Sequence, residues 1–309
     1  MKPDAIYFRR LAITALAVIA CVTGPVLAEG QPQDVTVFGD SLSDPGNVFA
    51  LTGAVSHTPY AVIPSAPYAI GGHHFSNGRT WIEQRPANDV NAQSSGPAYQ
   101  VSGVFTNYAV GGARARTTST GIDLTLQVQD YLADFGGARA AATHVIFIGG
   151  NDIRDALAAG GDPAIITGAV TAVADNIQTL YSAGARRFVV VNGPDLGLVP
   201  AVRMTGNPTV IAGATALSAA YNAGLAFAIA QLSALPGISI TTVDLFGEFE
   251  DIVANPGNYG LTNVMDMCIS PGVKGNAQCD NPDGYLFWDG IHPTKAGHAI
   301  LAAFIGAAL

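Results

Sequence analysis

Residues 35–44 read VTVFGDSLSD, and this stretch sets the plan of the chain. Val35 to Phe38 form a short run rich in β-branched residues, which is typical of a buried strand, and Gly39 ends the run. Ser41 follows the predicted strand end almost at once. Because loops at strand ends often carry reactive side chains, this position can expose a hydroxyl group to a ligand.

Four further runs repeat the pattern of a short apolar stretch stopped by a loop residue. These runs are Thr106–Val110, His144–Ile148, Phe188–Val191 and Ile238–Val243. Helices are expected at Leu124–Phe135, Ala164–Ala183, Val210–Leu235 and Thr294–Leu309. Strands that alternate with helices predict an α/β fold, with a parallel sheet covered on both faces.

The composition limits the classes of protein to consider. The chain has 309 residues, 49% hydrophobic and 12% charged, which allows a substantial core. Its formal charge is −9 with 14 lysines and arginines, which argues against a nucleic-acid partner. No apolar run beyond the N-terminus approaches the roughly 20 residues of a membrane helix, so we expect no membrane span. No linker or repeat is evident, and the composition indicates no oligomeric state.

Residues 1–28 have the layout of a secretory signal peptide. Three basic residues precede an apolar run at 11–22, and Val26-Leu27-Ala28 supplies small residues at a cleavage position. We expect cleavage after Ala28, a secreted or periplasmic protein, and one domain over residues 29–309. A lipoprotein is an alternative, because the residues that end in Cys21 resemble a lipobox; an ordinary buried helix is another.

Two cysteines, Cys268 and Cys279, remain after this cleavage and lie on one short loop. In an oxidising compartment such a pair most simply forms a disulfide. A metal site would need more ligands nearby, and His73-His74 also lacks a third ligand at a suitable spacing. We therefore expect no metal and no cofactor. Gly149-Gly150-Asn151 does not continue into a dinucleotide-binding fingerprint.

The last predicted helix is preceded by a possible partner for Ser41. A serine hydroxyl is a weak nucleophile unless a base removes its proton, and a serine in a turn is more often a turn former. Asp289 lies three residues before His292. This spacing lets Asp289 accept a hydrogen bond from one imidazole nitrogen while the other nitrogen faces Ser41. A lone histidine at this place would otherwise be read as a surface residue.

Two further loops carry possible hydrogen-bond donors. The pair Gly111-Gly112 leaves backbone N–H groups unobstructed, which suits an oxyanion donor and equally a plain turn. Asn151 follows Gly149-Gly150 and can donate through its amide, or it can cap a helix.

Together these residues resemble a known family. The blocks Gly39-Asp40-Ser41-Leu42, Asn107 to Gly112, Gly149-x-Asn151-Asp152 and Asp289-x-x-His292 are similar to those of the GDSL esterases and lipases, also called SGNH hydrolases. They occur in the family's order, from residue 35 to 298. The segment Phe75–Trp81 (FSNGRTW) further resembles the plant-lipase-like branch, which also occurs in secreted bacterial enzymes. The resemblance implies a flavodoxin-like three-layer α/β/α sandwich with a five-stranded parallel sheet, and the hydrolysis of carboxylic esters.

The resemblance also implies a role for each site residue. Ser41 would attack the ester carbonyl, His292 would move the proton, and Asp289 would orient the imidazole. The oxyanion would be held by the backbone N–H groups of Ser41 and Gly112 and by the side-chain amide of Asn151. Two alternatives are a carbohydrate acetylesterase with the same triad and a secreted binding protein without turnover.

Residues 50–103 depart from the alternation of strands and helices, since they are rich in proline, glycine, asparagine, histidine and aromatics. We expect a long excursion near the mouth of the site, with a helix around Thr80–Gln84. This excursion and the loops at 194–205 and 255–285 are expected to set the choice of ester, while most of the aromatics pack on the core. The sequence does not indicate an acyl-chain length.

Overall fold

The computed structural model describes residues 32–53, 73–119, 121–269 and 278–309. The expected signal peptide, residues 54–72 of the excursion and residues 270–277 of the cysteine loop lie outside the described residues. The chain divides into Met1–Gly30 and Gln31–Leu309, and the description below concerns the second unit.

A parallel sheet of four strands, in the order β1-β2-β3-β4, runs through the described part of this unit. The strands are β1 (Val35–Gly39), β2 (Thr143–Phe147), β3 (Arg187–Val191) and β4 (Ser239–Val243). Their register places Val37 opposite Val145 and Val145 opposite Val189. β1 and β2 are buried throughout, as a sheet covered on both faces requires, whereas most of β4 is exposed at the edge.

Helices connect and flank these strands. Their bounds are α1 (Asn47–Thr52), α2 (Leu124–Phe135), α3 (Gly150–Ala158), α4 (Pro163–Ser182), α5 (Pro200–Arg203), α6 (Pro208–Leu232), α7 (Leu245–Ala254) and α8 (Lys295–Gly306). Short 3₁₀ turns lie at η3 (Ala92–Ser95), η4 (Leu196–Leu198), η5 (Pro256–Tyr259) and η6 (Pro282–Gly284). A second sheet of two parallel strands, β5 (Asn263–Met267) and β6 (Tyr285–Phe287), follows α7.

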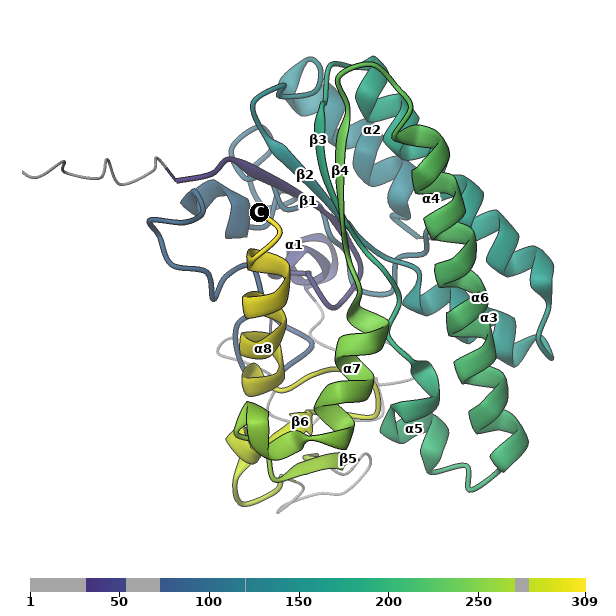
Figure 1. Ribbon diagram of the computed structural model, residues 1–309. Coiled ribbons are helices and arrows are strands. Elements are labelled where there is room, and N and C mark those ends of the chain that lie inside the picture. Colours follow the sequence, from purple (N-terminus) through teal and green to yellow (C-terminus); the bar gives the residue numbers. More distant parts are fainter. Residues whose placement is uncertain (1–31, 54–72, 120, 270–277) are drawn as a thin grey trace, which may run out of the picture. The chain divides into compact units, whose positions relative to one another are not determined.

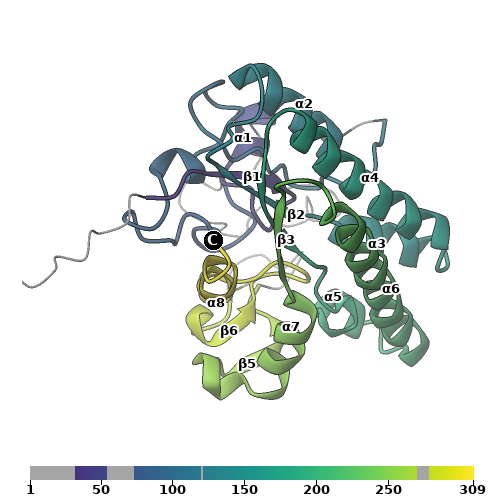
Figure 2. The same cartoon turned by 45° about the horizontal axis from the view of Figure 1, so that its top comes forward.

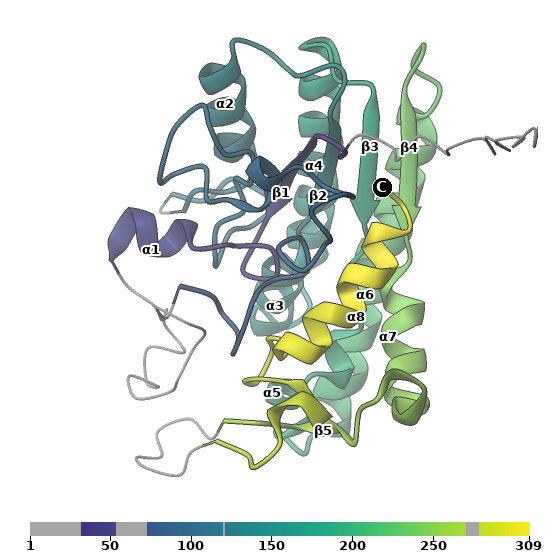
Figure 3. The ribbon, with the colours of Figure 1, turned by 90° about the vertical axis from the view of Figure 1, so that its left-hand side faces the viewer.

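Alternate strand residues face the two sides of the sheet and form two cores. Phe38 and Ile146 pack into a core with residues of α2, α4 and α6, while Val37 and Val145 pack with α8 and with Trp81. Figures 1 and 3 show α4 and α6 on one face of the sheet and α8 across the other. The three-layer α/β/α arrangement predicted from the sequence is therefore confirmed.

The predicted number of strands was wrong, because the described sheet has four strands and not five. The fifth predicted strand, Thr106–Val110, does lie beside β1, and its Tyr108 N–H donates to the Val37 carbonyl at 2.8 Å. On the other side of this segment, the Asn47 side-chain amide donates to the carbonyls of Asn107 and Ala109, each at 2.8 Å. In place of a continuous ladder, the segment forms isolated bridges at Asn107, one to Val37 and one to Pro97. If this segment is counted as a strand outside β1, the sheet has the strand order of flavodoxin-like folds.

Two helical segments differ from the expectations. Residues 81–84 form a turn in place of the helix expected around Thr80–Gln84, and the side chain of Glu83 accepts the Thr80 N–H at 2.9 Å. Helix α6 reaches 25 residues and contains an 18-residue window with a mean hydropathy of 1.4, so by length and composition alone it could cross a membrane. Its buried residues recur every three or four positions, and it packs on α3 and α4.

Candidate active site

The predicted site residues come from loops that follow strands. Ser41 follows β1, Asn151 is the second residue of α3 just after β2, and Asp289 and His292 lie between β6 and α8. Figures 1 and 2 show β6 and α7 beyond the carboxyl ends of the sheet strands. Open α/β sheets place their ligands at this end.

Ser41, His292 and Asp289 form a continuous hydrogen-bonded chain. The His292 Nε2 atom lies 2.8 Å from the Ser41 Oγ atom, and the Nδ1 atom lies 2.6 Å from Oδ2 of Asp289. The other oxygen of Asp289 accepts the backbone N–H groups of Ile291 and His292, at 2.9 and 2.8 Å. Asp289 therefore fixes both the ring and the backbone of the histidine.

The three side chains are shielded from water. Ser41 is 8% exposed, His292 is 3% exposed and Asp289 is fully buried. Burial acts to raise the pKa of Asp289, but the charge of His292 and the hydrogen bonds from its ring and from two backbone N–H groups outweigh burial and lower the pKa. Asp289 is therefore ionised at neutral pH, where it can stabilise a positive imidazole.

Buried aspartates brace the turn that carries Ser41. Asp40 accepts the Leu42 N–H at 3.0 Å. The carboxylate of Asp44 accepts the backbone N–H groups of residues 46–48 and of Gly111. Burial outweighs these bonds and raises the pKa of both aspartates to about 6. Both side chains therefore support the turn that carries Ser41.

Two amide side chains tie this turn to its surroundings. Asn107 donates to the Ser43 carbonyl at 2.9 Å. Gln127 of α2 exchanges two hydrogen bonds with the backbone of Gly39, at 2.9 and 2.8 Å. Gln127 was not predicted from the sequence. Its signal was a polar residue next to Val128 on the apolar face of an amphipathic helix, where a buried amide needs partners.

The glycines of the turn after Asn107 are not equivalent. The Gly111 N–H donates to Asp44, and a Cβ on Gly111 would lie 2.2 Å from the Phe75 ring. Gly112 has a φ of +84° and open space where a Cβ would be. Within the described residues its N–H has no hydrogen-bond acceptor. The space around Gly112 is therefore open, whereas that around Gly111 is filled.

Asn151 is held from both ends of its amide. Its Nδ2 atom donates to the Ala113 carbonyl at 2.9 Å, and its Oδ1 atom accepts from the Arg154 guanidinium at 3.0 Å. An amide nitrogen carries two hydrogens, so one of them can still serve a ligand. Asn151 does not cap α3, because Gly149 occupies the N-cap position.

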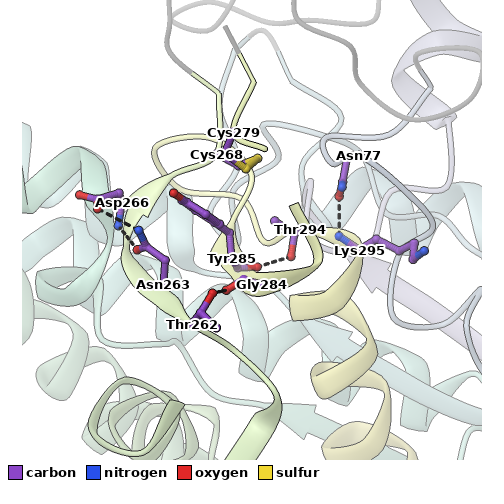
Figure 4. The surroundings of a disulfide bond; sticks show 10 residues. All are labelled: Asn77, Thr262, Asn263, Asp266, Cys268, Cys279, Gly284, Tyr285, Thr294 and Lys295. Carbon is purple, nitrogen blue, oxygen red and sulfur yellow. Dashed lines mark hydrogen bonds between the residues drawn. A yellow bond between two sulfur atoms is a disulfide. The ribbon is translucent and has the colours of Figure 1, made fainter. Parts of the chain in front are cut away.

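The segment FSNGRTW at 75–81 connects both sides of the site. Ser76 donates to the Pro293 carbonyl at 2.9 Å, and Asn77 accepts the Lys295 N–H at 2.6 Å (Figure 4). At its other end Trp81 donates to the hydroxyl of Ser43 at 2.8 Å. This part of the 50–103 excursion therefore braces the loops of the candidate nucleophile and of the candidate base.

The disulfide that the sequence suggested is present in the structure, between Cys268 and Cys279 (Figure 4). The Cys268 N–H donates to the Phe287 carbonyl at 3.0 Å, and the Ile269 N–H donates to the Trp288 carbonyl at 2.9 Å. The backbone at the disulfide is therefore hydrogen-bonded to the segment that leads directly into Asp289.

Three other histidines contact protein groups away from the hydrogen-bonded chain of Ser41. His74 bonds to Glu83 at 2.9 Å, and His73 stacks on Phe49 with ring centroids 3.7 Å apart. His298 is 1% exposed inside α8, so it is a packing residue; burial lowers its pKa to about 3. The aromatic residues Phe75 and Trp81 are also buried, as expected for packing.

A narrow cavity begins at the candidate nucleophile. Its polar lining consists of Asp40, Ser41, Asn151, Arg154 and His292. Its apolar lining comes from the η4 region, α7, β6 and α8, and includes Leu196, Val199, Leu245, Phe249, Ile252, Leu286, Phe287 and Leu301. The cavity volume is about 60 Å³.

The fold and the site define an α/β protein that carries a buried Ser–His–Asp chain at the carboxyl end of its sheet. Residues 35–305 match the family of GDSL-like lipases and acylhydrolases. The chain belongs to this family, which places it among hydrolases that act on esters.

The chain is similar to several individual proteins. A GDSL esterase/lipase of Arabidopsis thaliana is 28% identical, over 96% of this chain and 93% of its own. The anther-specific proline-rich protein APG of Brassica napus is 26% identical, over 87% of this chain and 71% of its own. Among solved structures, a catalytic mutant of an acetylxylan esterase from Geobacillus stearothermophilus has a TM-score of 0.49 at 12% identity, covering 90% of this chain and 94% of its own.

Proposed function

We propose that the protein is an exported serine esterase that cleaves carboxylic esters through Ser41, His292 and Asp289. The observation that carries the proposal is the unbroken hydrogen-bonded chain from the Ser41 hydroxyl to the Asp289 carboxylate. The hydrogen-bonded chain starts at Ser41, which lies in the wall of the cavity, so a substrate in the cavity has access to the serine. Family membership supports ester bonds as the target.

The proposed mechanism has two half-reactions. His292 takes the Ser41 proton at Nε2 as the oxygen attacks the ester carbonyl, and then gives this proton to the departing alcohol. A water molecule repeats the sequence on the acyl-enzyme and releases the acid. Asp289 keeps the Nδ1 proton in place throughout and stabilises the imidazolium.

The proposed oxyanion donors are the N–H groups of Ser41 and Gly112 and the Asn151 amide. The conformation of Gly112 supports this role, because its N–H is unobstructed while that of Gly111 is occupied. The contact between Asn151 and the Ala113 carbonyl supports it too, because this contact keeps two of the three donors close together. A missing donor of this kind costs ~3–4 kcal/mol of transition-state stabilisation.

The cavity supports an ester with an apolar chain. Beyond its five polar residues the wall is made of aliphatic and aromatic side chains, which favour the burial of methylene groups at about 0.8 kcal/mol each. The free volume is small, and we infer a slot that admits an unbranched chain more readily than a ring. We therefore favour acyl chains longer than acetyl over a carbohydrate acetylesterase.

Export is part of the proposal. We infer that residues 1–28 are a leader removed after Ala28 and that residues 29–309 form the active domain; lipidation at Cys21 remains the alternative. The disulfide between Cys268 and Cys279 supports an oxidising compartment. Mass spectrometry of the protein secreted by a bacterial host tests both forms, since the new N-terminus distinguishes Ala28 cleavage from a lipidated Cys21.

Purified residues 29–309 would be assayed on p-nitrophenyl esters from acetate to palmitate, with and without a chelator. Turnover that resists the chelator and disappears in Ser41→Ala supports the proposal. Ser95→Ala, in the turn η3, serves as the matched serine control, because the Ser95 hydroxyl donates to the carbonyl of nearby Ala92. Full activity of Ser41→Ala would overturn the serine mechanism, and a strict preference for acetate would favour the acetylesterase. Lack of turnover on every ester, from a folded protein, would favour a non-catalytic binding protein.

A further inference from the structure

Acidic and basic side chains gather around the loop that follows Gly112. Arg114 and Arg116 lie on this loop, and Asp152 and Asp155 lie on α3, the helix that carries Asn151. Only 12% of the chain is charged, so these four residues, together with Arg154, which bonds to Asn151, form a conspicuous cluster beside two proposed oxyanion donors. None of the four was predicted to have a role.

Arg114 connects the two elements. Its Nε and Nη2 atoms donate to the two oxygens of Asp155 at 3.0 and 3.1 Å, which is a bidentate pair. Its remaining nitrogen, Nη1, donates to the Gly112 carbonyl at 2.7 Å. One guanidinium therefore fixes the Gly112 carbonyl, one Cα away from the Gly112 N–H, to the helix of Asn151.

Asp152 forms a second attachment next to the first. Its carboxylate accepts the Ala115 N–H at 2.7 Å and pairs with Arg116 at 3.1 Å. Asp152 is fully buried, while the side chains of Arg114 and Asp155 are about one-third exposed. The hydrogen bond from Arg114 and the charges of Arg114 and Arg116 outweigh burial and lower the pKa of Asp155, so the pair is ionised at neutral pH.

We propose that Arg114 and Asp155 are positioning residues, which hold the Gly112 N–H and the Asn151 amide at a fixed separation as an oxyanion hole. This inference rests on the proposed function. Neither side chain belongs to the cavity lining, so neither needs to touch the substrate. Donors aimed in advance at the developing charge require no reorganisation during the reaction, and a rigid ion pair provides this rigidity.

The test compares Asp155→Asn and Arg114→Lys with the unaltered enzyme. Asp155→Asn keeps the shape but removes the charge, and Arg114→Lys keeps the charge but cannot form the bidentate pair and reach Gly112 together. We expect kcat to fall by about 10- to 100-fold with KM nearly constant, less than the 10²–10³-fold cost of a lost donor. Asp89→Asn, which breaks the pair of Asp89 with Arg85, is the control and should keep its activity.

A second readout separates positioning from general stability. A boronic acid that forms a tetrahedral adduct on Ser41 should lose affinity by the same factor as kcat/KM, whereas the carboxylic acid product should bind unchanged. Thermal melting would be recorded for every variant. Equal losses for the boronic acid and for the product, or normal kcat in a folded Asp155→Asn protein, would overturn the proposal. Ser41→Ala tests the proposed function separately, because it removes the proposed nucleophile and leaves both ion pairs in place.

Discussion

Asp289 forms three hydrogen bonds within four residues of chain, two of them with His292 and one with Ile291. One carboxylate oxygen lies 2.6 Å from Nδ1 of the ring, and the other accepts the backbone N–H groups of Ile291 and His292. A single side chain thus sets the tautomer of the imidazole and the conformation of the loop that carries it. The Pro293 carbonyl and the Lys295 N–H, just beyond, are held from the other side by Ser76 and Asn77.

Asp289→Asn should lower kcat by about 10⁴-fold at neutral pH. The amide can still accept the backbone N–H groups, but with its nitrogen toward Nδ1 it favours the wrong tautomer, with a proton on the nitrogen that faces Ser41. Initial rates on p-nitrophenyl butyrate measure the loss, and circular dichroism checks the fold. A folded variant that keeps more than a tenth of the activity would contradict the proposed role.

The sequence predicted most of what depends on local pattern. Each strand of the main sheet was expected from a short apolar run stopped by a loop residue, and helix α2 has the predicted bounds Leu124–Phe135. The serine, the histidine and their aspartate could be found because their motif blocks are short and lie at strand or helix boundaries. The distances between them depend on the fold and could only come from the structure.

What the sequence did not predict depends on contacts between distant segments. Thr106–Val110 has the composition of a strand, yet on its outer side a distant side chain, that of Asn47, donates to two of its carbonyls. The pair of β5 and β6 lies in a region expected to be irregular. The partnership of Arg114 with Asp155 spans 41 positions, and no local period reports such a contact.

Asp40 should make stability depend on pH in the direction opposite to an ordinary ion-paired carboxylate. Burial is the main cause that raises its pKa from 3.8 to about 6, so the folded chain holds the proton more tightly than the unfolded chain. Its contribution is therefore present below about pH 4 and is lost as the pH rises to about 6. Asp40→Asn should remove this loss, which is on the order of 2–3 kcal/mol.

Urea unfolding of both proteins at pH 4.5 and pH 7.5 measures this effect. The variant should gain stability relative to the unaltered protein as the pH rises. Asp251→Asn provides a control of opposite sign, because hydrogen bonds from Tyr259 and Asn255 lower the pKa of Asp251. Parallel pH dependences of the unaltered protein and Asp40→Asn would show that Asp40 is ionised equally in the folded and unfolded chains.

Replacing both cysteines, Cys268→Ser with Cys279→Ser, should lower stability by about 3 kcal/mol, because the bond closes a loop with a sequence separation of 11. For a domain of this size the midpoint of thermal unfolding should fall by about 5 °C or more. We expect kcat at 20 °C to stay within about twofold, since Asp289 and His292 keep their own hydrogen bonds. Scanning calorimetry and initial rates measure both quantities. A large loss of kcat in the folded variant would mean that the disulfide itself positions the histidine loop.

Leu196 and Leu198 offer a matched test of the apolar cavity. Both lie on η4, but Leu196 lines the cavity and Leu198 does not. Leu196→Phe should shorten the slot, so kcat/KM should fall about 10-fold or more for octanoate while acetate hydrolysis is nearly unchanged. Leu198→Phe adds a similar volume outside the slot and should leave the chain-length profile as it is.

The same pair of variants identifies which part of the ester occupies the slot. With p-nitrophenyl esters only the acyl chain varies, whereas the alkyl acetates from ethyl to octyl acetate vary the alcohol alone. If the acyl chain occupies the slot, Leu196→Phe changes the first profile and not the second. A change confined to the alkyl acetates would assign the slot to the alcohol, and identical profiles for both variants would mean that neither chain reaches Leu196. The free space beside Leu196 is small. A phenylalanine at this position would therefore fill space that the substrate chain needs, so the chain-length profile should respond strongly to the substitution.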